Sequence, residues 1–528
     1  MSQTIFSAIN VIPIPSSVKE GTGHFLFTQK TTIQFSGGDE SKKVAQFFVR
    51  ILHNSIGTDY LVNQQTGKAN SILFLLDKSL NLPQEGYKLT VHADKIMVTA
   101  NTANGLFYGM QTLRQLFPPE IEKTASVFTN WTIPCVEIED SPRFEYRGMH
   151  LDVSRHFFNK SFILKYIDLM SMYKYNRFHW HLTDDQGWRI EIKRFPKLTK
   201  IGAFRTDCKN DTIGGYYTQQ EIKEVVDYAK ERFVEVIPEI EMPGHSMAVL
   251  SCYPELSCSG GPFTVPSTWG IFPDVFCAGN DQTFEFIENI LDEVTALFPY
   301  KYIHIGGDEC PKKRWERCVK CQARMVRENL WSEHELQSYF VKRIEGYLNT
   351  KGKQIIGWDE ILEGGVSNTA TIMSWRGTSG GVEAAQHNNH AVMSPVTHCY
   401  FDHYQGLEAE EPLAFGKGRN CEIPLQRVYD FEPIPSSLTE SQSKYIIGGQ
   451  ANLWSEYLTT QQQVEYMAYP RALALIECLW SDSKNKNYSD FEKRVHTHYL
   501  RLDNYGLNYS KSGDKPTTKE RYRLLFGK

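Results

Sequence analysis

Two adjacent carboxylates, Asp308 and Glu309, end the segment His304-Ile-Gly-Gly-Asp-Glu309 and are the side chains of this 528-residue sequence best suited to acid–base chemistry. In a regular β-strand neighbouring side chains point to opposite faces, so both carboxylates could not reach one pocket from unbroken β-structure. Gly306 and Gly307 permit the backbone to turn there. Two carboxylates held close together have their pKa values pushed apart, so one can stay ionised while the other holds a proton.

An acid for a leaving oxygen and an anion for a developing cation are what glycosidic bond hydrolysis requires. The competing interpretation is a divalent-metal site, because Asp and Glu at strand ends also bind Mg²⁺. Other motifs are incomplete: Gly21-Thr-Gly23 lacks the third glycine of a dinucleotide loop, Gly244-His245-Ser246 is not a serine-hydrolase elbow, and Ser338 replaces the second His after His334-Glu335. We expect no metal and no organic cofactor.

The elements that must position this pair are apolar runs of strand length, most of them followed by a helix-like segment. Eight such runs can be counted: Tyr146 to Val153, Arg177 to Thr183, Val234 to Ile240, Tyr302 to Ile305, Gln354 to Trp358, Thr371 to Trp375, Ala391 to Pro395, and Ile446 to Leu453. Helices are expected over Ser161 to Tyr173, Thr218 to Arg232, Gln282 to Leu297, Ser332 to Thr350, and Gly381 to Asn388. Parallel strands joined by helices predict an α/β fold, a (β/α)8 TIM barrel.

Polar residues follow each of these runs. They are Asp152 and Arg155, Asp184 and Asp185, Glu241 and His245, Asp308 and Glu309, Asp359 and Glu360, Arg376, Asp402, and Trp454 with Glu456. Any one of them alone would be read as a solvated strand end or a helix cap. Active sites of such barrels lie at the carboxyl ends of the strands, so the eight segments together predict one shared pocket.

A separate, small α+β domain is expected before the barrel. Short strand-like runs such as Ser71 to Leu76 and Tyr87 to Val91 occur there, with amphipathic segments at Val44 to Leu52 and Ala103 to Leu116. The proline-containing run Thr129 to Ser141 makes a plausible linker. We therefore divide the chain into an N-terminal domain, residues 1–140, and a barrel domain, residues 141–528, that includes a C-terminal helical tail.

The amino-acid composition argues against some classes of binding partner. With 57 Lys and Arg against 62 Asp and Glu, the net charge of -5 gives no electrostatic reason to bind nucleic acid or anionic membranes. No run approaches the roughly 20 apolar residues of a membrane helix. Met1 to Asn10 lacks the features of a secretory signal, and we expect that any signal has been removed from this chain.

The 11 cysteines are an odd number. Cys258 and Cys277 flank a Pro/Gly-rich loop and could form a disulfide. Cys318-Val-Lys-Cys321, with Cys310 nearby, resembles a metal knuckle without a fourth ligand. Ordinary reduced thiols are at least as good an interpretation of both sets.

Several motifs, in one order along the chain, resemble glycoside hydrolase family 20, the β-N-acetylhexosaminidases. They are Arg147-Gly-Met-His-Leu-Asp152 with Arg155, His179-Trp-His-Leu-Thr-Asp-Asp185 with Gly187-Trp-Arg189, Pro238-Glu-Ile-Glu-Met-Pro-Gly-His245, His304 to Glu309, Gly357-Trp-Asp-Glu360, Ser374-Trp-Arg376, Tyr400 with Asp402, and Gln450-Ala-Asn-Leu-Trp-Ser-Glu456. The resemblance spans about Phe144 to Leu479, and the region before Asp140 looks like that family's non-catalytic domain.

The resemblance implies roles for these residues. Glu309 is similar to the family's general acid/base, and Asp308 to the residue that orients and charge-stabilises the substrate's 2-acetamido group, which acts as the nucleophile. Tyr400 would donate its hydroxyl to the acetamido carbonyl. The aromatic walls around the sugar would be Trp358, Trp375 and Trp454.

The resemblance also implies hydroxyl ligands. Arg155 would bind the C3 and C4 hydroxyls and Glu456 the C4 and C6 hydroxyls, with Asp402 placed similarly to Glu456. Asp185 and His245 would steady Glu309 and tune its proton affinity. Taken alone, His245 would be read as a buried structural histidine.

The expected activity is removal of terminal β-linked GlcNAc or GalNAc from a glycan, retaining and without a cofactor. The rivals are release of a disaccharide or of a sulfated sugar, a non-catalytic carbohydrate-binding barrel, and a metal-dependent hydrolase. Arg155, Asp402 and Glu456 favour a closed single-sugar site. A periplasmic or secreted location in a bacterial envelope is expected, and a homodimer is the assembly that we consider.

Overall fold

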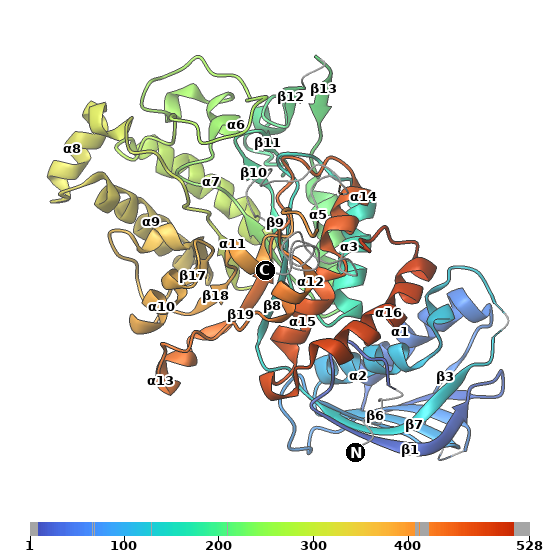
Figure 1. Ribbon diagram of the computed structural model, residues 1–528. Helices are drawn as coiled ribbons and strands as arrows, with labels where there is room; N and C mark the ends of the chain where they lie inside the picture. Colours follow the sequence, from blue (N-terminus) through green and yellow to red (C-terminus); the bar gives the residue numbers. More distant parts are fainter. Residues whose placement is uncertain are drawn as a thin grey trace, which may run out of the picture.

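The computed structural model describes residues 9–65, 67, 69–127, 129–207, 210–406, 411 and 422–511. It has two parts, an N-terminal sheet covered by helices and a closed barrel (Figure 1). Residues 1–8 and 512–528, which belong to the N-terminal segment and C-terminal tail considered above, lie outside the described residues.

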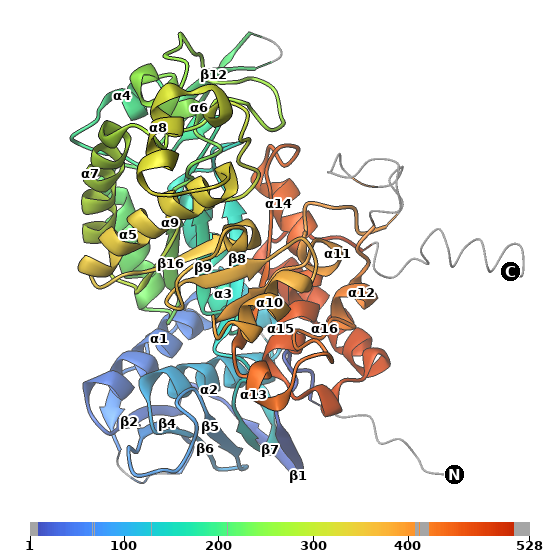
Figure 2. The ribbon, with the colours of Figure 1, turned by 90° about the vertical axis from the view of Figure 1, so that its left-hand side faces the viewer.

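The N-terminal part is a seven-stranded mixed sheet in the order β1-β7-β5-β6-β4-β2-β3. The prediction of a linker from Thr129 to Ser141 is wrong, because most of this run is the strand β7, which pairs with β1 and β5. Two helices, α1 and α2, lie between this sheet and the barrel (Figure 2). Thr102 begins α2 because its side chain accepts a hydrogen bond from the Gly105 backbone N–H. The bounds are β1 Ser17–Leu26, β2 Thr32–Ser36, α1 Asp39–Ile56, β3 Val62–Gln64, β4 Ser71–Leu76, β5 Tyr87–Val91, β6 Lys95–Ala100, α2 Ala103–Leu116 and β7 Thr132–Asp140.

The predicted TIM barrel is confirmed. Eight parallel strands close in the order β14-β15-β16-β17-β18-β19-β8-β9. Their bounds are β8 Tyr146–Asp152, β9 Arg177–His181, β14 Glu235–Glu239, β15 Tyr302–His304, β16 Gln354–Trp358, β17 Thr371–Ser374, β18 Ala391–Met393 and β19 Ile446–Ala451. The expected run Arg177 to Thr183 is divided in the structure, because after His181 the chain leaves the barrel and forms the hairpin β10 Thr183–Asp184 and β11 Gly187–Trp188.

Helices follow most of the strands, and side-chain caps fix where they begin. Asn159, Thr218, Asn280 and Ser332 each accept a hydrogen bond from a backbone N–H in the first turn of the helix that follows. The helices are α3 Lys160–Met172, α5 Gln219–Lys230, α7 Asp281–Leu297, α9 Glu333–Thr350, α10 Ser379–Gln386 and α15 Arg471–Trp480. After β16 the chain makes only a short 3-10 helix, Asp359–Leu362.

Shorter helices and strands lie in the segments that connect the main barrel elements, mainly at the carboxyl ends of the strands. They are α4 Lys197–Lys200, β12 Phe204–Thr206, β13 Thr212–Gly214, α6 Met247–Leu250, α8 Val319–Arg327, α11 Val396–Cys399, α12 Leu425–Tyr429, α13 Glu440–Ser443 and α14 Gln461–Ala468. The last described helix, α16 Tyr488–Tyr505, contacts the N-terminal part: Arg501 lies 3.3 Å from Glu122.

Buried polar contacts join the two parts. Asp140, at the end of β7, accepts hydrogen bonds from Tyr87 at 2.6 Å and from the Trp480 indole at 3.0 Å. Arg147 at the start of the barrel pairs with Glu85 at 2.8 Å. Breaking such buried pairs one partner at a time is costly, so the parts are expected to hold a constant orientation.

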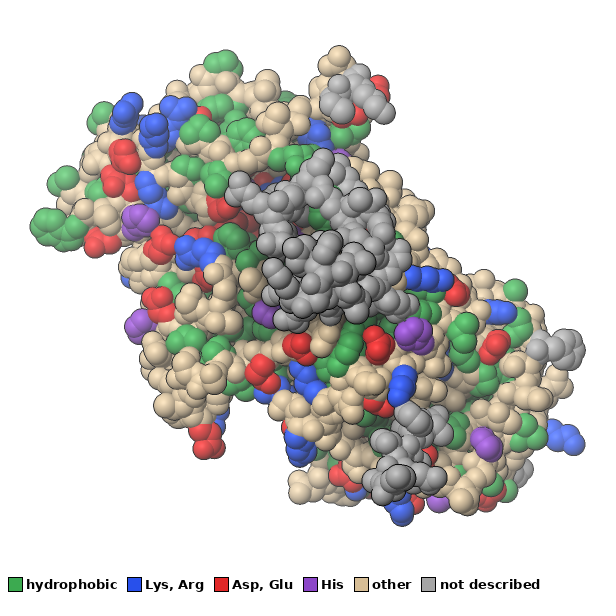
Figure 3. Space-filling view, viewed as in Figure 1, with side chains coloured by type: hydrophobic (Ala, Val, Ile, Leu, Met, Phe, Trp, Pro, Cys, Tyr) green, Lys and Arg blue, Asp and Glu red, His purple; other side chains and the backbone are tan. Residues whose placement is uncertain are grey.

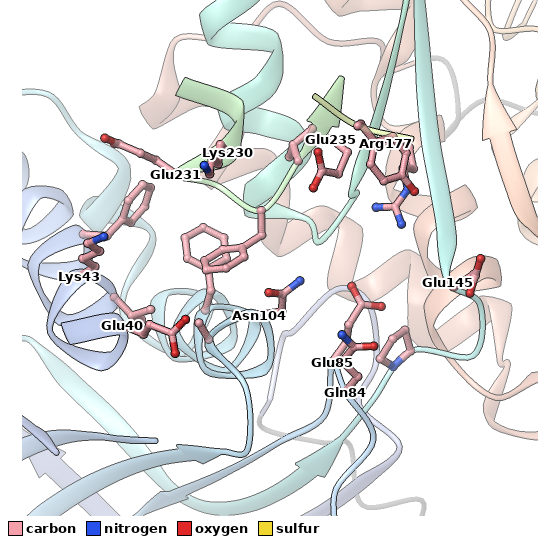
Figure 4. A pocket seen from close by; sticks show the side chains of 18 of the residues that line it. Glu40, Lys43, Gln84, Glu85, Asn104, Glu145, Arg177, Lys230, Glu231 and Glu235 are labelled. Atoms are coloured by element: carbon pink, nitrogen blue, oxygen red, sulfur yellow. The ribbon is translucent and has the colours of Figure 1, made fainter. Parts of the chain in front are cut away.

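A cavity of about 1200 Å³ lies between the two parts (Figure 4). Arg177 and Glu235, which line it, are the first residues of β9 and β14, so the cavity is at the amino-terminal ends of the strands. Barrel enzymes carry their chemistry at the other end. In the described ranges, no helix has both the length and the apolarity needed to cross a membrane.

Candidate active site

The residues singled out from the sequence lie at or beyond the carboxyl ends of the barrel strands, so one end of the barrel carries them all. Asp308 and Glu309 follow β15, Arg155 follows β8, Asp185 follows β9 and His245 follows β14. The remaining six come from the last four strands and the segments after them: Trp358, Trp375, Tyr400, Asp402, Trp454 and Glu456.

The carboxylate pair sits on a turn that needs glycine. Gly306 has a φ of 66°, and a Cβ there would lie 1.7 Å from an oxygen of Glu241. Glu309 itself has a φ of 43°. The turn lets two adjacent side chains serve one site: Asp308 is buried, whereas 36% of the Glu309 side chain is exposed. Glu309 is thus the more exposed of the two carboxylates.

His245 joins the pair to further carboxylates. Its Nδ1 lies 3.0 Å from Asp185 and 3.2 Å from Asp184, while Nε2 faces Asp308 at 3.7 Å and Glu309 at 3.6 Å. Burial alone would lower the pKa of His245, but the carboxylates of Asp184 and Asp308 outweigh it, and the pKa is raised well above its usual value. The raised pKa favours the cationic imidazole beside Asp308 and Glu309.

Asp308 is partly protonated at mildly acidic pH. Burial is the main reason that its pKa is raised to about 6, with a contribution from Glu309, while the cationic His245 opposes the rise. Asp308 Oδ1 is buried and has no hydrogen-bond partner among the described residues. An ionised, unsatisfied oxygen of this kind suits a ligand N–H group.

Arg155 lies in a buried cluster of polar side chains at the same end of the barrel, which we call the polar wall. Its guanidinium lies 3.2 Å from Asp152 and 2.9 Å from Asp184, and Nε donates to Gln186 at 3.1 Å. These contacts hold its planar fork in one orientation. Burial raises the pKa of Glu456, although the charge of Arg155 opposes the rise.

Asp402 completes this wall. Burial and the charge of Glu456 raise its pKa well above the usual range, and its Oδ1 has no hydrogen-bond partner among the described residues. A buried carboxyl group without a partner is costly unless a ligand satisfies it. Asp402 and Glu456 are therefore suited to bind hydroxyl groups.

Aromatic side chains gather at the same end of the barrel. The rings of Trp375 and Tyr400 are stacked with centroids 6.0 Å apart, and Trp454 lies 6.4 Å from Tyr400 and 5.7 Å from Trp358. Trp358 is only 1% exposed, so it is the floor rather than a side wall. The guanidinium of Arg155 lies 5.1 Å from the Trp454 ring centre, which joins the aromatic and polar walls.

Glu239 is the centre of a buried group of hydrogen-bonded side chains next to Trp358, which we call the Glu239 hub. The sequence did not assign a role to it. Glu239 lies 2.9 Å from His179 and 2.8 Å from His304, and accepts a hydrogen bond from the Trp358 indole at 2.9 Å. Burial would raise the pKa of Glu239, but the charge of His304 leads the contributions that bring it well below the usual value. The hub fixes the Trp358 ring in place.

Two further carboxyl groups face the pair. Burial, and next the charge of Asp308, raise the pKa of Glu241 well above its usual range and that of Glu360 to about 8. Glu360 accepts a hydrogen bond from the Trp375 indole at 2.9 Å. Both glutamates stand among the polar residues that follow the predicted strands, but the sequence assigned neither of them a role.

The Mg²⁺ alternative involves the same side chains. His245, Asp308 and Glu309 could together offer three ligand atoms. Mg²⁺ takes oxygen ligands in octahedral geometry, whereas one of these three atoms is an imidazole nitrogen. Activity that persists in a chelator is the outcome that separates acid–base catalysis from a metal-dependent hydrolase.

Residues 144–483 match the model of the glycosyl hydrolase family 20 catalytic domain, and residues 8–141 match domain 2 of that family. A β-hexosaminidase of Porphyromonas gingivalis is 46% identical over 95% of this chain, which spans 64% of the length of that relative.

Solved structures of family 20 enzymes are similar to this chain. The GH20 β-N-acetylhexosaminidase of Streptomyces coelicolor A3(2) has a TM-score of 0.85 at 30% identity, covering 97% of this chain and 99% of that one. A mutant β-hexosaminidase of Streptomyces plicatus, solved with its product GlcNAc, has a TM-score of 0.85 at 31% identity, covering 97% of this chain and 98% of that one.

Proposed function

The chain belongs to glycosyl hydrolase family 20, and we propose that it is an exo-acting β-N-acetylhexosaminidase that removes terminal GlcNAc or GalNAc from glycans. The observation that carries the proposal is the Asp308–Glu309 pair, held by a glycine turn at the end of β15 and at the same end of the barrel as Arg155 and the stacked rings of Trp375 and Tyr400. The aromatic walls suit the apolar face of a sugar, and the unsatisfied carboxyl oxygens suit its polar groups.

Hydrolysis proceeds in two steps with the substrate supplying the nucleophile. Glu309 protonates the glycosidic oxygen while the acetamido carbonyl oxygen attacks the anomeric carbon, so the bond to the leaving group breaks and a bicyclic oxazolinium ion forms. Asp308 accepts the acetamido N–H and stabilises the positive charge, and Tyr400 donates its hydroxyl to the attacking oxygen. Glu309 then takes a proton from water, which opens the ring and restores the β configuration.

The exo pocket can be tested with a chito-oligosaccharide. If Arg155, Asp402 and Glu456 bind the terminal hydroxyls, single GlcNAc units should leave from the non-reducing end. A time course by chromatography should therefore show GlcNAc from the first minutes. Early accumulation of mid-chain fragments or of disaccharide would contradict the proposal. Rates on 4-nitrophenyl β-GlcNAc, β-GalNAc, β-Glc and 6-sulfo-GlcNAc separate the sugar preferences.

Glu456→Ala should raise KM and lower kcat together, because contacts far from the bond help to position the reacting centre. Losing one hydrogen bond to a charged group, worth about 1.5–3 kcal/mol, predicts a fall in kcat/KM of about 10- to 100-fold. Glu440→Ala, at an exposed position in α13, is the matched control and should match the wild type. An unchanged kcat/KM in Glu456→Ala would remove Glu456 from the site.

The pH dependence should report on Asp308. Its carboxylate is the form that stabilises a cation, so kcat/KM should fall as the pH drops below about 6, the raised pKa of the folded protein. His245→Gln removes the neighbouring cation that lowers this pKa, and the acid limb should move to higher pH. His334→Gln, at an exposed histidine outside the pocket, is the control. Identical acid limbs for wild type and His245→Gln would contradict the assignment.

The location follows from the substrate class. We propose that the enzyme works in the periplasm or is secreted, because polymeric glycans are met outside the cytoplasm. Fractionation of cells that produce the full-length protein checks this, and recovery in the cytoplasmic fraction would contradict it.

Assembly is a separate proposal: two copies associate as a homodimer. Val319, Val326 and Trp331, on or just after α8, are at least 80% exposed. Figure 3 shows hydrophobic side chains at the left-hand edge of the molecule, where Figure 1 places α8. Covering such a surface is favourable. Light scattering should give twice the chain mass of 60.8 kDa, and Trp331→Glu should halve it; a monomeric wild type would overturn the proposal.

A further inference from the structure

Four cysteines from two distant parts of the chain meet beside α8. The sulfur atoms of Cys258 and Cys321 are 3.7 Å apart, and that of Cys277 is 3.7 Å from those of both Cys318 and Cys321. All four sulfurs lie within 4.8 Å of one another. We call Cys258, Cys277, Cys318 and Cys321 the cysteine cluster.

The structure decides between the alternatives that the sequence left open for these cysteines. Cys258 and Cys277 are reduced thiols and not a disulfide. Cys310 does not join the Cys318–Cys321 pair: it packs behind the active-site turn, where its Cα would be 3.3 Å from a Cβ added to Gly244. The tertiary fold brings Cys258 and Cys277 next to Cys318 and Cys321. The partners that the Cys318–Cys321 pair lacks in the sequence are therefore Cys258 and Cys277.

The sulfur spacing identifies the kind of site. A disulfide requires sulfurs about 2.05 Å apart, and the closest pairs here are at 3.7 Å. Zinc bound tetrahedrally by thiolates at about 2.3 Å separates neighbouring sulfurs by about 3.8 Å. We propose that the cysteine cluster binds one Zn²⁺ ion as a structural site with four thiolate ligands. Each coordinated thiol releases its proton to solvent, and no electron is transferred.

The backbone holds the two halves of the site before any metal arrives. Cys277 donates its N–H to Leu256 at 2.8 Å, which brings Cys277 close to Cys258. Cys318 is the N-cap residue of α8 and Cys321 lies in its first turn, the Cys-x2-Cys spacing of zinc knuckles. Gly279 permits the approach of these halves, since a Cβ there would be 2.1 Å from the Lys320 backbone.

The sequence around Cys318 and Cys321 is rich in basic residues, which suits a zinc–thiolate centre. Four thiolates and Zn²⁺ carry a net charge of about −2, which nearby cations stabilise. The segment that supplies Cys318 and Cys321 is strongly basic, and Arg314 ties it to the other half of the site through an ion pair with Asp274 at 2.8 Å. Its basic residues are Lys312, Lys313, Arg314, Arg317, Lys320 and Arg324.

The site would hold the rim of the sugar pocket. The loop between Cys258 and Cys277 carries Thr268, whose carbonyl accepts a hydrogen bond from Gln186 at 3.0 Å, and Gln186 in turn accepts one from Arg155. Trp269 from the same loop lies 4.9 Å from the Arg205 guanidinium. Zinc would fix both ends of this loop, and its role is to position the rim and not to take part in the reaction.

The test begins with the wild-type chain, purified with a tag that does not bind metal. Plasma mass spectrometry should find about one zinc per chain, and X-ray absorption at the zinc edge should find four sulfurs at about 2.3 Å. Two disulfides by intact mass, zinc held by nitrogen or oxygen, or iron in place of zinc would each overturn the proposal. These measurements do not depend on a variant that folds.

Variants locate the site. Cys277→Ser and Cys321→Ser should each lower zinc content by about tenfold or more, because a tetrahedral site loses a ligand. Cys252→Ser replaces a buried cysteine outside the cluster and should keep its zinc. Zinc retained in both ligand variants would refute the assignment.

Protection of the loop between Cys258 and Cys277 from proteolysis gives an independent readout. When a chelator with a thiol-reactive mercurial strips the zinc, chymotrypsin should cut faster within residues 259–276, at Phe263, Trp269 or Phe272. An equal rate in the metal-free and zinc-loaded protein would refute the positioning role. None of these readouts requires glycosidase activity, so they stand or fall separately from the proposed function.

Discussion

Glu309→Gln should slow hydrolysis of natural glycans by roughly 10² to 10⁴, the usual loss when a general acid is removed. A sugar alkoxide is a poor leaving group and needs a proton as the bond breaks. Substrates with an acidic leaving group, such as a 2,4-dinitrophenyl glycoside, need none in this step. The first step should therefore be nearly normal for the activated substrate and severely slowed for a chito-oligosaccharide.

The second step separates this role from a merely structural one. The variant lacks the base that activates water, so the bicyclic intermediate should persist, and azide, which needs no base, should restore turnover and give the β-glycosyl azide. Glu383→Gln, an exposed position in α10, is the matched control and should behave as the wild type. Equal losses on both substrates, with no azide product, would count against Glu309.

Electron withdrawal from the substrate's acetamido group should reduce the rate steeply with each added fluorine, because the carbonyl oxygen of this group is the proposed nucleophile. Comparison of N-acetyl, N-fluoroacetyl, N-difluoroacetyl and N-trifluoroacetyl substrates in one assay measures the dependence. The corresponding glucoside should barely react. A thiazoline mimic of the intermediate should bind about 10²-fold or more tightly than substrate.

Asp308→Asn should lower kcat by about 10² to 10³, the loss typical of removing one group that stabilises transition-state charge. The fluorine dependence should weaken, since the charge that Asp308 stabilises forms as the acetamido oxygen attacks. Asp503→Asn, exposed in α16, is the control for the same chemical change. A fluorinated series that reacts at one rate, or a labelled sugar trapped on Asp308, would make Asp308 an ordinary nucleophile and overturn this mechanism.

Pattern alone was enough to predict the barrel. Strand runs such as Gln354 to Trp358 are continuous and apolar because a strand buried on both faces has no polar side, and the helices between them begin at residues such as Thr218 and Asn280 that cap locally. The motif order along the chain likewise predicted membership of family 20, which the family-model match confirms. These signals come from residues that are close together in the sequence, so they can be recognised without the tertiary structure.

Only the tertiary structure decided what lies around those residues. Glu239 becomes a hub because His179 and His304, on neighbouring strands, converge on it inside the barrel, and no spacing along one segment reveals that convergence. The raised pKa of Asp308 depends on burial and on His245, which is 63 residues away in sequence. The cysteine cluster also depends on the tertiary structure, because the packing of loops brings the sulfurs of Cys277 and Cys321 together. Local propensity acts over a few residues, whereas desolvation, charge and coordination depend on three-dimensional neighbours.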